Sequence, residues 1–378
     1  MHEKALKYFK GDRIIWTVII VLCLFSLLAV SSSTSALAYK NRSGSMFYYF
    51  FRQGTFLVLG LGIVYVVHLI PYKYFSRLSQ LVLLISIPLL LVTLLFGTSI
   101  NDAARWLTLP GGLTFQTSDL AKLALVTYLA RQLSLKQEKI KSFREAFVPL
   151  ILPVFVVCGL IIPADLSTAL LLFLVSLLLL FIGRVPLRYI MLLSFGMLFL
   201  VASLVYVGKM AGWEGRWETA YNRATSFINK EEGNNYQADQ SKIAIATGGL
   251  LGKGPGNSVQ RNFLPHPYSD FIYAIILEEW GFLGGLLIIF LYMYLMFRAG
   301  VIVRKSTRTF QAFVVFGLSL LLVLQAMVNM AVAVGIVPVT GQPLPFISMG
   351  GTSIMFTALA FGIILSVSNN IESNTSTN

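Results

Sequence analysis

Charged residues are scarce in this chain of 378 residues. They make up 12% of the chain, with 16 acidic and 29 basic residues. A typical soluble domain is about 25% charged. Hydrophobic residues account for 56% of the chain, and its mean hydropathy is +0.77. The shortage of charge therefore excludes an ordinary water-soluble domain and indicates that lipid is the main solvent.

Cysteine and histidine are also rare. Cys23 and Cys158 each fall within an apolar block. Isolated thiols in such blocks behave as small core residues, so we expect neither a disulfide framework nor a cysteine metal cluster. His2, His68 and His266 lie far apart in the chain, which argues against a His-rich metal site.

Apolar blocks of about 20 residues, each long enough to cross a bilayer as a helix, recur along the whole chain. We predict an all-α, polytopic integral membrane protein with about ten transmembrane helices. Residues 1–368 are expected to form one transmembrane domain, and residues 369–378 a disordered polar tail. The predicted spans are 14–32, 50–70, 78–96, 118–133, 147–163, 166–183, 188–208, 270–297, 311–334 and 351–368.

The net charge of +13 follows a topological pattern. Basic residues concentrate in the short segments 4–13, 131–144 and 298–308, which face the cytoplasm if both termini are inside. This N-in/C-in orientation accounts for most of the positive charge and removes the reason to expect nucleic acid as a partner. The first block lacks a small-residue cleavage site, so it is expected to remain as an anchor.

Two segments predicted to lie outside the membrane are longer than a connection needs, namely 97–119 and a large extracytoplasmic loop at about 209–269, between spans seven and eight. Long ordered loops usually carry function. The stretch GGLLGKGPGNS (248–258) in the larger loop resembles a phosphate loop, but Thr247 stands where that motif needs its first glycine. We interpret it as a glycine-rich loop on a binding surface, with amides available to an anion.

Four residues near the ends of predicted spans are candidates with two interpretations. Arg105 and Trp106 suit either an interfacial anchor or a ligand site. Lys122 lies within a span, where a charge normally faces a cavity or a partner; Asp119, three residues earlier, is one such partner. Asp165 is either a helix N-cap or a functional acid.

In the large loop, Arg216 and Arg223 flank Trp217 and Tyr221. Aromatic rings stack on sugars and arginine binds phosphate bidentately, so the pattern fits a sugar–phosphate ligand. It fits equally a helix that lies on lipid headgroups.

Three acids lie in FLPHPYSDFIYAIILEEWGF, residues 263–282. Ser269 is expected to cap the following helix and to place Asp270 in its first turn. There, Asp270 either stabilises the helix end, deprotonates a hydroxyl or holds a divalent cation. On a straight helix, Glu278 and Glu279 point away from Asp270, so Glu278 or Glu279 is expected to pair with a basic residue of another span.

The stretch NMAVAVGIVPVTGQPLPFISMGGTSIM (329–355) contains three prolines and several glycines. It predicts a broken, re-entrant-looking segment, which membranes tolerate only where the backbone is buried or lines a cavity. Gly350 and Gly351 also suit close helix packing.

Taken together, these stretches resemble the SEDS family (shape, elongation, division and sporulation proteins). The opening of the chain and the long stretch YQADQSKIAIATGGLLGKGPGNS are most similar to the division branch of that family. One departure is at residues 116–119, which read Gln-Thr-Ser-Asp where the family has Gln-Pro-Ser-Glu, so Asp119 receives no assigned role. The matching stretches are ARWL, LAKL, DLSTAL, NRATSF, YQADQSKIAIATGGLLGKG, LPHPYSDFIYAIILEEWG and VPVTGQPLPFISMGGTS.

The resemblance implies a peptidoglycan glycosyltransferase that polymerises lipid II, a disaccharide-peptide on undecaprenyl pyrophosphate. It implies that Asp270 is the catalytic aspartate, which acts either as general base or as the ligand of a divalent cation (Mg²⁺ or Mn²⁺), the only cofactor expected. Arg105 and Lys122 would then bind pyrophosphate, and Trp106, Arg216 and Arg223 complete the expected substrate-binding set.

The same resemblance implies a class B penicillin-binding protein and other division proteins as partners, in the bacterial cytoplasmic membrane at the division septum. A lipid II flippase, which transports without bond chemistry, is the alternative. It needs a polar path through the bilayer, whereas the candidate residues gather at the outer face. A scaffold that only recruits a transpeptidase does not explain Lys122 within a span.

Overall fold

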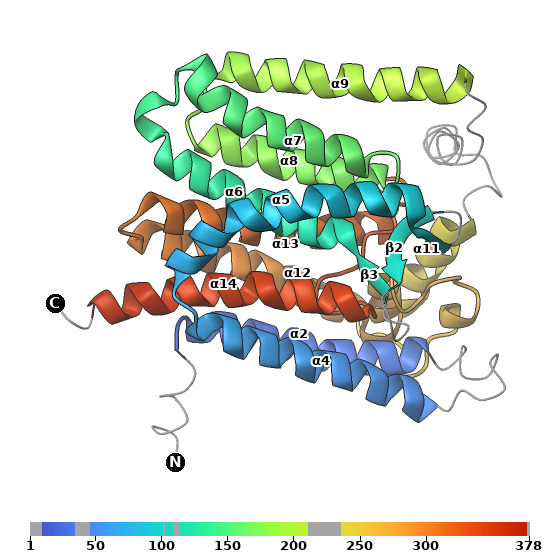
Figure 1. Cartoon of the computed structure of the whole chain (residues 1–378). Coiled ribbons are helices and arrows are strands. Elements are labelled where there is room, and N and C mark those ends of the chain that lie inside the picture. The colour runs from blue at the N-terminus through green and yellow to red at the C-terminus, as the bar shows by residue number, and fades with distance from the viewer. Residues whose placement is uncertain (1–9, 35–45, 101–102, 109–113, 211–235, 376–378) are drawn as a thin grey trace. The chain divides into compact units, whose positions relative to one another are not determined.

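The computed structural model describes residues 10–34, 46–100, 103–108, 114–210 and 236–375 (Figure 1). A helix lies at each predicted span, which confirms the helical membrane class. The helices are α2 (Arg13–Ser33), α4 (Met46–Leu69), α5 (Tyr72–Phe96), α6 (Thr117–Leu135), α7 (Val148–Ile161), α8 (Leu166–Ile182), α9 (Leu187–Met210), α12 (Ile272–Lys305), α13 (Thr309–Ala333) and α14 (Gly351–Thr375).

Seven of the described helices are long and apolar enough to cross a membrane. The helices α7 and α8 are apolar but shorter, and α6 carries Asp119, Lys122 and Arg131. The class of integral membrane protein is therefore established, whereas the count of about ten spans and the N-in/C-in orientation stay predictions.

The chain divides into two compact units, each built from distant stretches of sequence. The first unit contains 1–67, 223–298 and 322–362; the second unit contains 68–222, 299–321 and 363–378. Helices α12, α13 and α14 contribute residues to both units. The single transmembrane domain at 1–368 stays a prediction. Helix α14 continues to Thr375, so the expectation of a disordered tail from residue 369 is wrong for 369–375.

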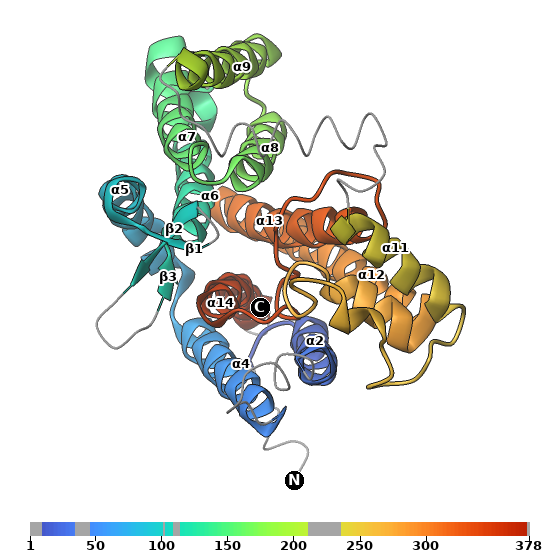
Figure 2. The same cartoon turned by 90° about the vertical axis from the view of Figure 1, so that its right-hand side faces the viewer.

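In the second unit, α6, α7, α8 and α9 pack against one another (green in Figure 1). Residues 97–119, predicted as a loop, contain a small antiparallel sheet, which an all-α prediction missed. Its strands are β1 (Thr98–Ile100), β2 (Ala103–Thr108) and β3 (Thr114–Gln116) in the order β1-β2-β3, and Trp106 pairs with Gln116. Strand β2 packs on α5, as Figure 2 shows.

Two acids begin helices. The carboxylate of Asp12 accepts hydrogen bonds from the amides of Ile14 and Ile15 at the start of α2 and forms an ion pair with Arg298. Asp165 is the N-cap of α8, as one of its two interpretations predicted, and accepts from the Thr168 amide at 3.0 Å. Such caps satisfy amides that have no partner within the helix.

The large loop contains a short helix, α11 (Tyr236–Gly248), and a 3₁₀ turn, η3 (Gln260–Asn262). The Ser241 hydroxyl donates to the Ala333 carbonyl at 2.6 Å and joins α11 to the end of α13. Between α13 and α14 the backbone is irregular, as the prolines and glycines of 329–355 predicted. Gly351 lies so close to Phe56 that a Cβ there would be 2.7 Å from the ring, in agreement with the predicted helix packing.

Candidate functional site

Asp270 lies in a turn before α12, and its side chain is half-buried. Helix α12 begins only at Ile272. The expectation that Ser269 caps this helix is wrong, because the Ser269 hydroxyl donates to Asp270 Oδ1 at 2.7 Å instead. Oδ2 faces Gly341, where a Cβ would lie 3.6 Å away. The carboxylate is therefore oriented by one hydroxyl and approached closely by a glycine of the irregular segment.

The irregular segment 334–350 donates hydrogen bonds to main-chain carbonyls of this turn. The Met349 amide donates to the Tyr268 carbonyl at 2.8 Å, and the Ser348 hydroxyl donates to the Ser269 carbonyl at 2.6 Å. Buried carbonyls need such donors, and these come from residues about 80 positions away. The turn is thus an ordered structure, held by contacts that no local pattern encodes.

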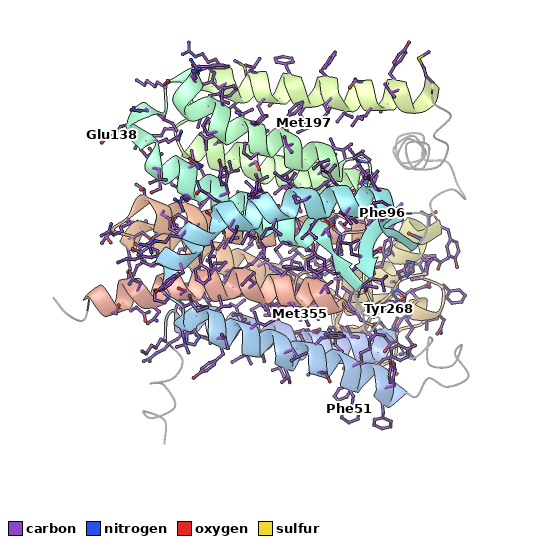
Figure 3. All side chains as sticks on the ribbon, viewed as in Figure 1. Phe51, Phe96, Glu138, Met197, Tyr268 and Met355 are labelled. Atoms are coloured by element: carbon purple, nitrogen blue, oxygen red, sulfur yellow. The ribbon has the colours of Figure 1, made fainter. Side chains whose placement is uncertain are left out.

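Tyr268, which Figure 3 labels, lies two residues before Asp270 in this turn. Burial raises the pKa of the Tyr268 phenol above its usual value, and the Asp270 carboxylate and Tyr49 add to the rise, while the Arg52 guanidinium opposes it. Tyr268 therefore stays protonated at neutral pH, as a hydroxyl that is able to donate a hydrogen bond. Our reading of the sequence missed Arg52; a cation just inside an apolar block was the available signal.

Glu278 and Glu279 are both buried on α12, at 0% and 1% exposure. Their predicted pairing with bases of other spans is wrong. Glu278 instead forms an ion pair with Lys253 of the glycine-rich loop, at 2.6 Å. The Glu279 carboxylate accepts from Ser32, at the end of α2, and from the Ser258 amide.

The glycine-rich loop holds an anion that belongs to the protein itself. The Ser258 hydroxyl and the amides of Val259 and Gln260 donate to the Glu278 carboxylate, at 2.5, 3.1 and 3.2 Å. The expectation that amides of this loop suit an anion is met by the Ser258 amide, which donates to the Glu279 carboxylate at 3.2 Å. This loop therefore has a structural role that explains why acids occur inside an apolar helix.

The same loop packs against a break in α12 at Gly281, whose φ of 68° and ψ of −169° are not helical. Carbonyls freed on the helix accept from the loop: Lys253 N donates to Glu278 O at 3.0 Å, and Gly254 N to Glu279 O at 2.9 Å. In return, Phe282 N donates to Gly249 O at 2.9 Å. The loop thus replaces the helical hydrogen bonds that the break removes.

Arg105, on β2, is bound to the start of α8. Its guanidinium lies 3.1 Å from Asp165 Oδ2, and its Nε donates to the Ala164 carbonyl at 2.9 Å. The Arg105 side chain remains 31% exposed, and its neighbour Trp106 is half-buried. A guanidinium has five N–H donors, so Arg105 can bind an anion while it keeps both of these contacts.

Lys122, on α6, forms the predicted pair with Asp119 at 2.8 Å, and both side chains are 6% exposed. The second oxygen, Asp119 Oδ2, is buried and accepts no hydrogen bond within the part of the chain that the structure describes. This lysine is therefore held by a carboxylate of its own helix.

The predicted site residues fall into separate groups. Arg105, Trp106 and Lys122 belong to the second unit, and Asp270 to the first. Arg216 and Arg223 lie outside the described residues. Among the residues described, His, Cys, Asp and Glu form no group of three that suits a metal ion. The divalent cation expected at Asp270 stays a prediction.

Comparison with known proteins agrees with the fold and the motifs. The profile of the FtsW/RodA/SpoVE family, described as cell cycle protein, matches residues 12–373. The chain therefore belongs to this family, which is the SEDS family that its motifs resemble.

Its curated relatives are similar over nearly their whole length. A "Probable peptidoglycan glycosyltransferase FtsW" of Geobacter sulfurreducens is 33% identical and covers 96% of each chain. A protein of the same name in Coxiella burnetii is 33% identical over 93% of this chain and 96% of its own.

Solved structures share the fold. A chain from "Structural coordination of polymerization and crosslinking by a peptidoglycan synthase complex" superposes with a TM-score of 0.75 at 24% identity, over 95% of this chain and 98% of the other. The rod shape determining protein RodA of Thermus thermophilus gives a TM-score of 0.69 at 23% identity, over 96% and 98%.

Proposed function

We propose that this protein is a peptidoglycan glycosyltransferase that polymerises lipid II into β-1,4 glycan strands on the outer face of the cytoplasmic membrane, during septal wall synthesis. The observation that carries the proposal is the near full-length similarity to relatives named as such enzymes. The Asp270 turn supplies what the reaction needs, a carboxylate held in an ordered and partly dry setting.

In the proposed reaction, the 4-hydroxyl oxygen of one saccharide attacks the anomeric carbon of another. A C–O bond forms, the bond from that carbon to the pyrophosphate oxygen breaks, and undecaprenyl pyrophosphate leaves with the electron pair. Asp270 accepts the hydroxyl proton as general base. Its Oδ1 is already bonded to Ser269, so Oδ2 is the oxygen we assign to this transfer.

We assign pyrophosphate binding to Arg105 and Lys122 from their own chemistry. Arg105 is the stronger candidate, because it is partly exposed and keeps donors beyond those that bind Asp165 and Ala164. Lys122 is buried in an ion pair with Asp119, so it would attract the pyrophosphate by its positive charge while it stays paired. Trp106, Arg216 and Arg223 complete the proposed set as sugar-stacking and phosphate-binding groups.

A divalent cation defines the alternative role of Asp270, in which its carboxylate is a metal ligand instead of the base. Asp270 would hold Mg²⁺ or Mn²⁺ together with substrate phosphates, and the ion would stabilise charge on the leaving pyrophosphate. The proton transfer to Asp270 and the binding of pyrophosphate by Arg105 are assigned to these side chains and require no cation.

The proposed partner is a class B penicillin-binding protein that crosslinks the product, together with other division proteins. One structural neighbour comes from a peptidoglycan synthase complex, which supports a partnership of this kind. The septal location follows from the division branch to which the named relatives belong.

Lipid II polymerisation in detergent by the purified protein with its transpeptidase partner tests the function. We expect glycan polymer on a gel from the wild type and none from Asp270→Asn, because the amide keeps the shape of the side chain but cannot accept the proton. An unchanged thermal unfolding midpoint would show that the variant is folded.

Two results would contradict these assignments. Polymer from Asp270→Asn at the wild-type rate would remove Asp270 as the base and leave the enzyme intact. A folded wild-type complex that makes no polymer, yet moves labelled lipid II across vesicle membranes, would establish the flippase alternative.

A further inference from the structure

Asn329, near the end of α13, is 1% exposed and bonds to two irregular segments at once. Its Nδ2 donates to the Asp270 carbonyl at 2.9 Å and to the Gln342 carbonyl at 2.7 Å. Both partners are carbonyl oxygens, so only the nitrogen end of the amide can face them. The side chain therefore has one orientation that its surroundings accept.

This contact completes a row on the Asp270 turn. The consecutive carbonyls of Tyr268, Ser269 and Asp270 accept, in order, from Met349 N, Ser348 Oγ and Asn329 Nδ2. The third bond is the one made by the carbonyl of the proposed base itself.

The next residue, Phe271, is anchored differently. It is 1% exposed and packs with Leu264, Ile275 and Val332 in an apolar cluster. Asp270 is thus followed by a core residue and preceded by two residues whose carbonyls are hydrogen-bonded, Tyr268 and Ser269. Because the side chain has few internal rotations, the position of its main chain largely determines where the carboxylate lies.

We infer that Asn329 is a positioning residue for Asp270, which fixes the carbonyl of the proposed base and so the place of its carboxylate. The inference rests on the proposed function. A misplacement of about 1 Å in a reacting group can cost about 100-fold in rate, whereas substrate contacts made by other residues are untouched. Substitution of Asn329 is therefore expected to lower kcat and to leave KM nearly unchanged.

Gln325 offers a matched control. It lies one turn earlier on α13 and donates to the Pro343 carbonyl at 3.0 Å, in the irregular segment but outside the Asp270 turn. Asn329→Leu and Gln325→Leu each remove one buried side-chain amide from the same helix. Each variant also leaves a carbonyl of the irregular segment without its hydrogen-bond donor. A merely structural role predicts similar effects from the two variants.

The experiment measures lipid II polymerisation by the wild-type, Asn329→Leu and Gln325→Leu proteins, each with its transpeptidase partner. We expect Asn329→Leu to lower kcat about 10- to 100-fold with KM within about twofold, and Gln325→Leu to change kcat less than about threefold. In Asn329→Asp, an ionised carboxylate cannot donate. Its kcat is therefore expected to fall as pH rises through the pKa of the new acid, a step absent from Asn329→Leu.

Equal losses of kcat in Asn329→Leu and Gln325→Leu, or a change in KM alone, would overturn the inference. If the folded wild type makes no polymer, it is the proposed function that fails. Amide hydrogen exchange at residues 268–271 then decides the inference by itself. Exchange there is expected to rise at least about tenfold in Asn329→Leu but not in Gln325→Leu, and equal exchange would refute the role of Asn329.

Discussion

At the scale of single residues, the acids of α12 and its preceding turn have different roles. Asp270 is half-buried and accepts from one hydroxyl, so its second oxygen remains for chemistry. Glu278 is fully buried and accepts from the side chains of Lys253 and Ser258 and from the two amides that follow Ser258. Burial with a full set of donors is characteristic of a structural charge.

Glu278→Gln tests this structural role. The variant keeps the shape of the side chain but loses the charge that binds Lys253 and places an NH₂ group against loop donors. We expect the free energy of unfolding to fall by about 1–3 kcal/mol, because buried donors of the loop lose their acceptor. The loss stays in this range since Lys253 is partly exposed and can be solvated when it loses its partner. Thermal unfolding in detergent measures this, and an unchanged midpoint would contradict it.

At the scale of elements, the break in α12 depends on close contact between two backbones. A Cβ on Gly281 would lie 2.3 Å from the Leu250 carbonyl, and a Cβ on Gly252 would lie 2.2 Å from the Glu279 carbonyl. Both glycines also have positive φ, of 68° and 81°. No other residue type fits either position without a shift of the loop.

Gly281→Ala is therefore expected to destabilise the protein strongly, with Gly256→Ala as the control. Gly256 has a φ of 82°, but a Cβ there would meet nothing within 4 Å. The control adds only the conformational cost of a side chain at positive φ, about 1–2 kcal/mol. The unfolding midpoints should fall much further for Gly281→Ala, and equal shifts would show that the backbone contact is unimportant.

At the scale of the whole molecule, the predicted orientation is open to a direct test. Cys23 and Cys158 are buried, at 6% and 0% exposure, so background labelling of the native thiols is expected to be low. Lys139 and Asn262 are exposed, on segments predicted to lie inside and outside. With a membrane-impermeant thiol reagent on intact cells, Asn262→Cys should be labelled and Lys139→Cys protected. The reverse result would invert the topology.

Much of this molecule could be read from local patterns. Hydrophobic blocks predicted where the long helices lie, because a membrane helix satisfies its own backbone hydrogen bonds. Asp165 was readable as a cap and Lys122–Asp119 as a pair, since both interactions join residues three apart. Small sheets such as β1–β3 were missed, because short strands carry little periodicity in a chain dominated by apolar helices.

The sequence by itself determined the membrane class, the family and Asp270 as the chemical candidate, because composition, span length and motifs are local properties. The tertiary structure decided that Glu278 and Glu279 bind the glycine-rich loop and Ser32, that Gly281 interrupts α12, and that Asn329 reaches the Asp270 carbonyl. These contacts join residues far apart in the chain. They depend on how backbones pack, which no local pattern encodes.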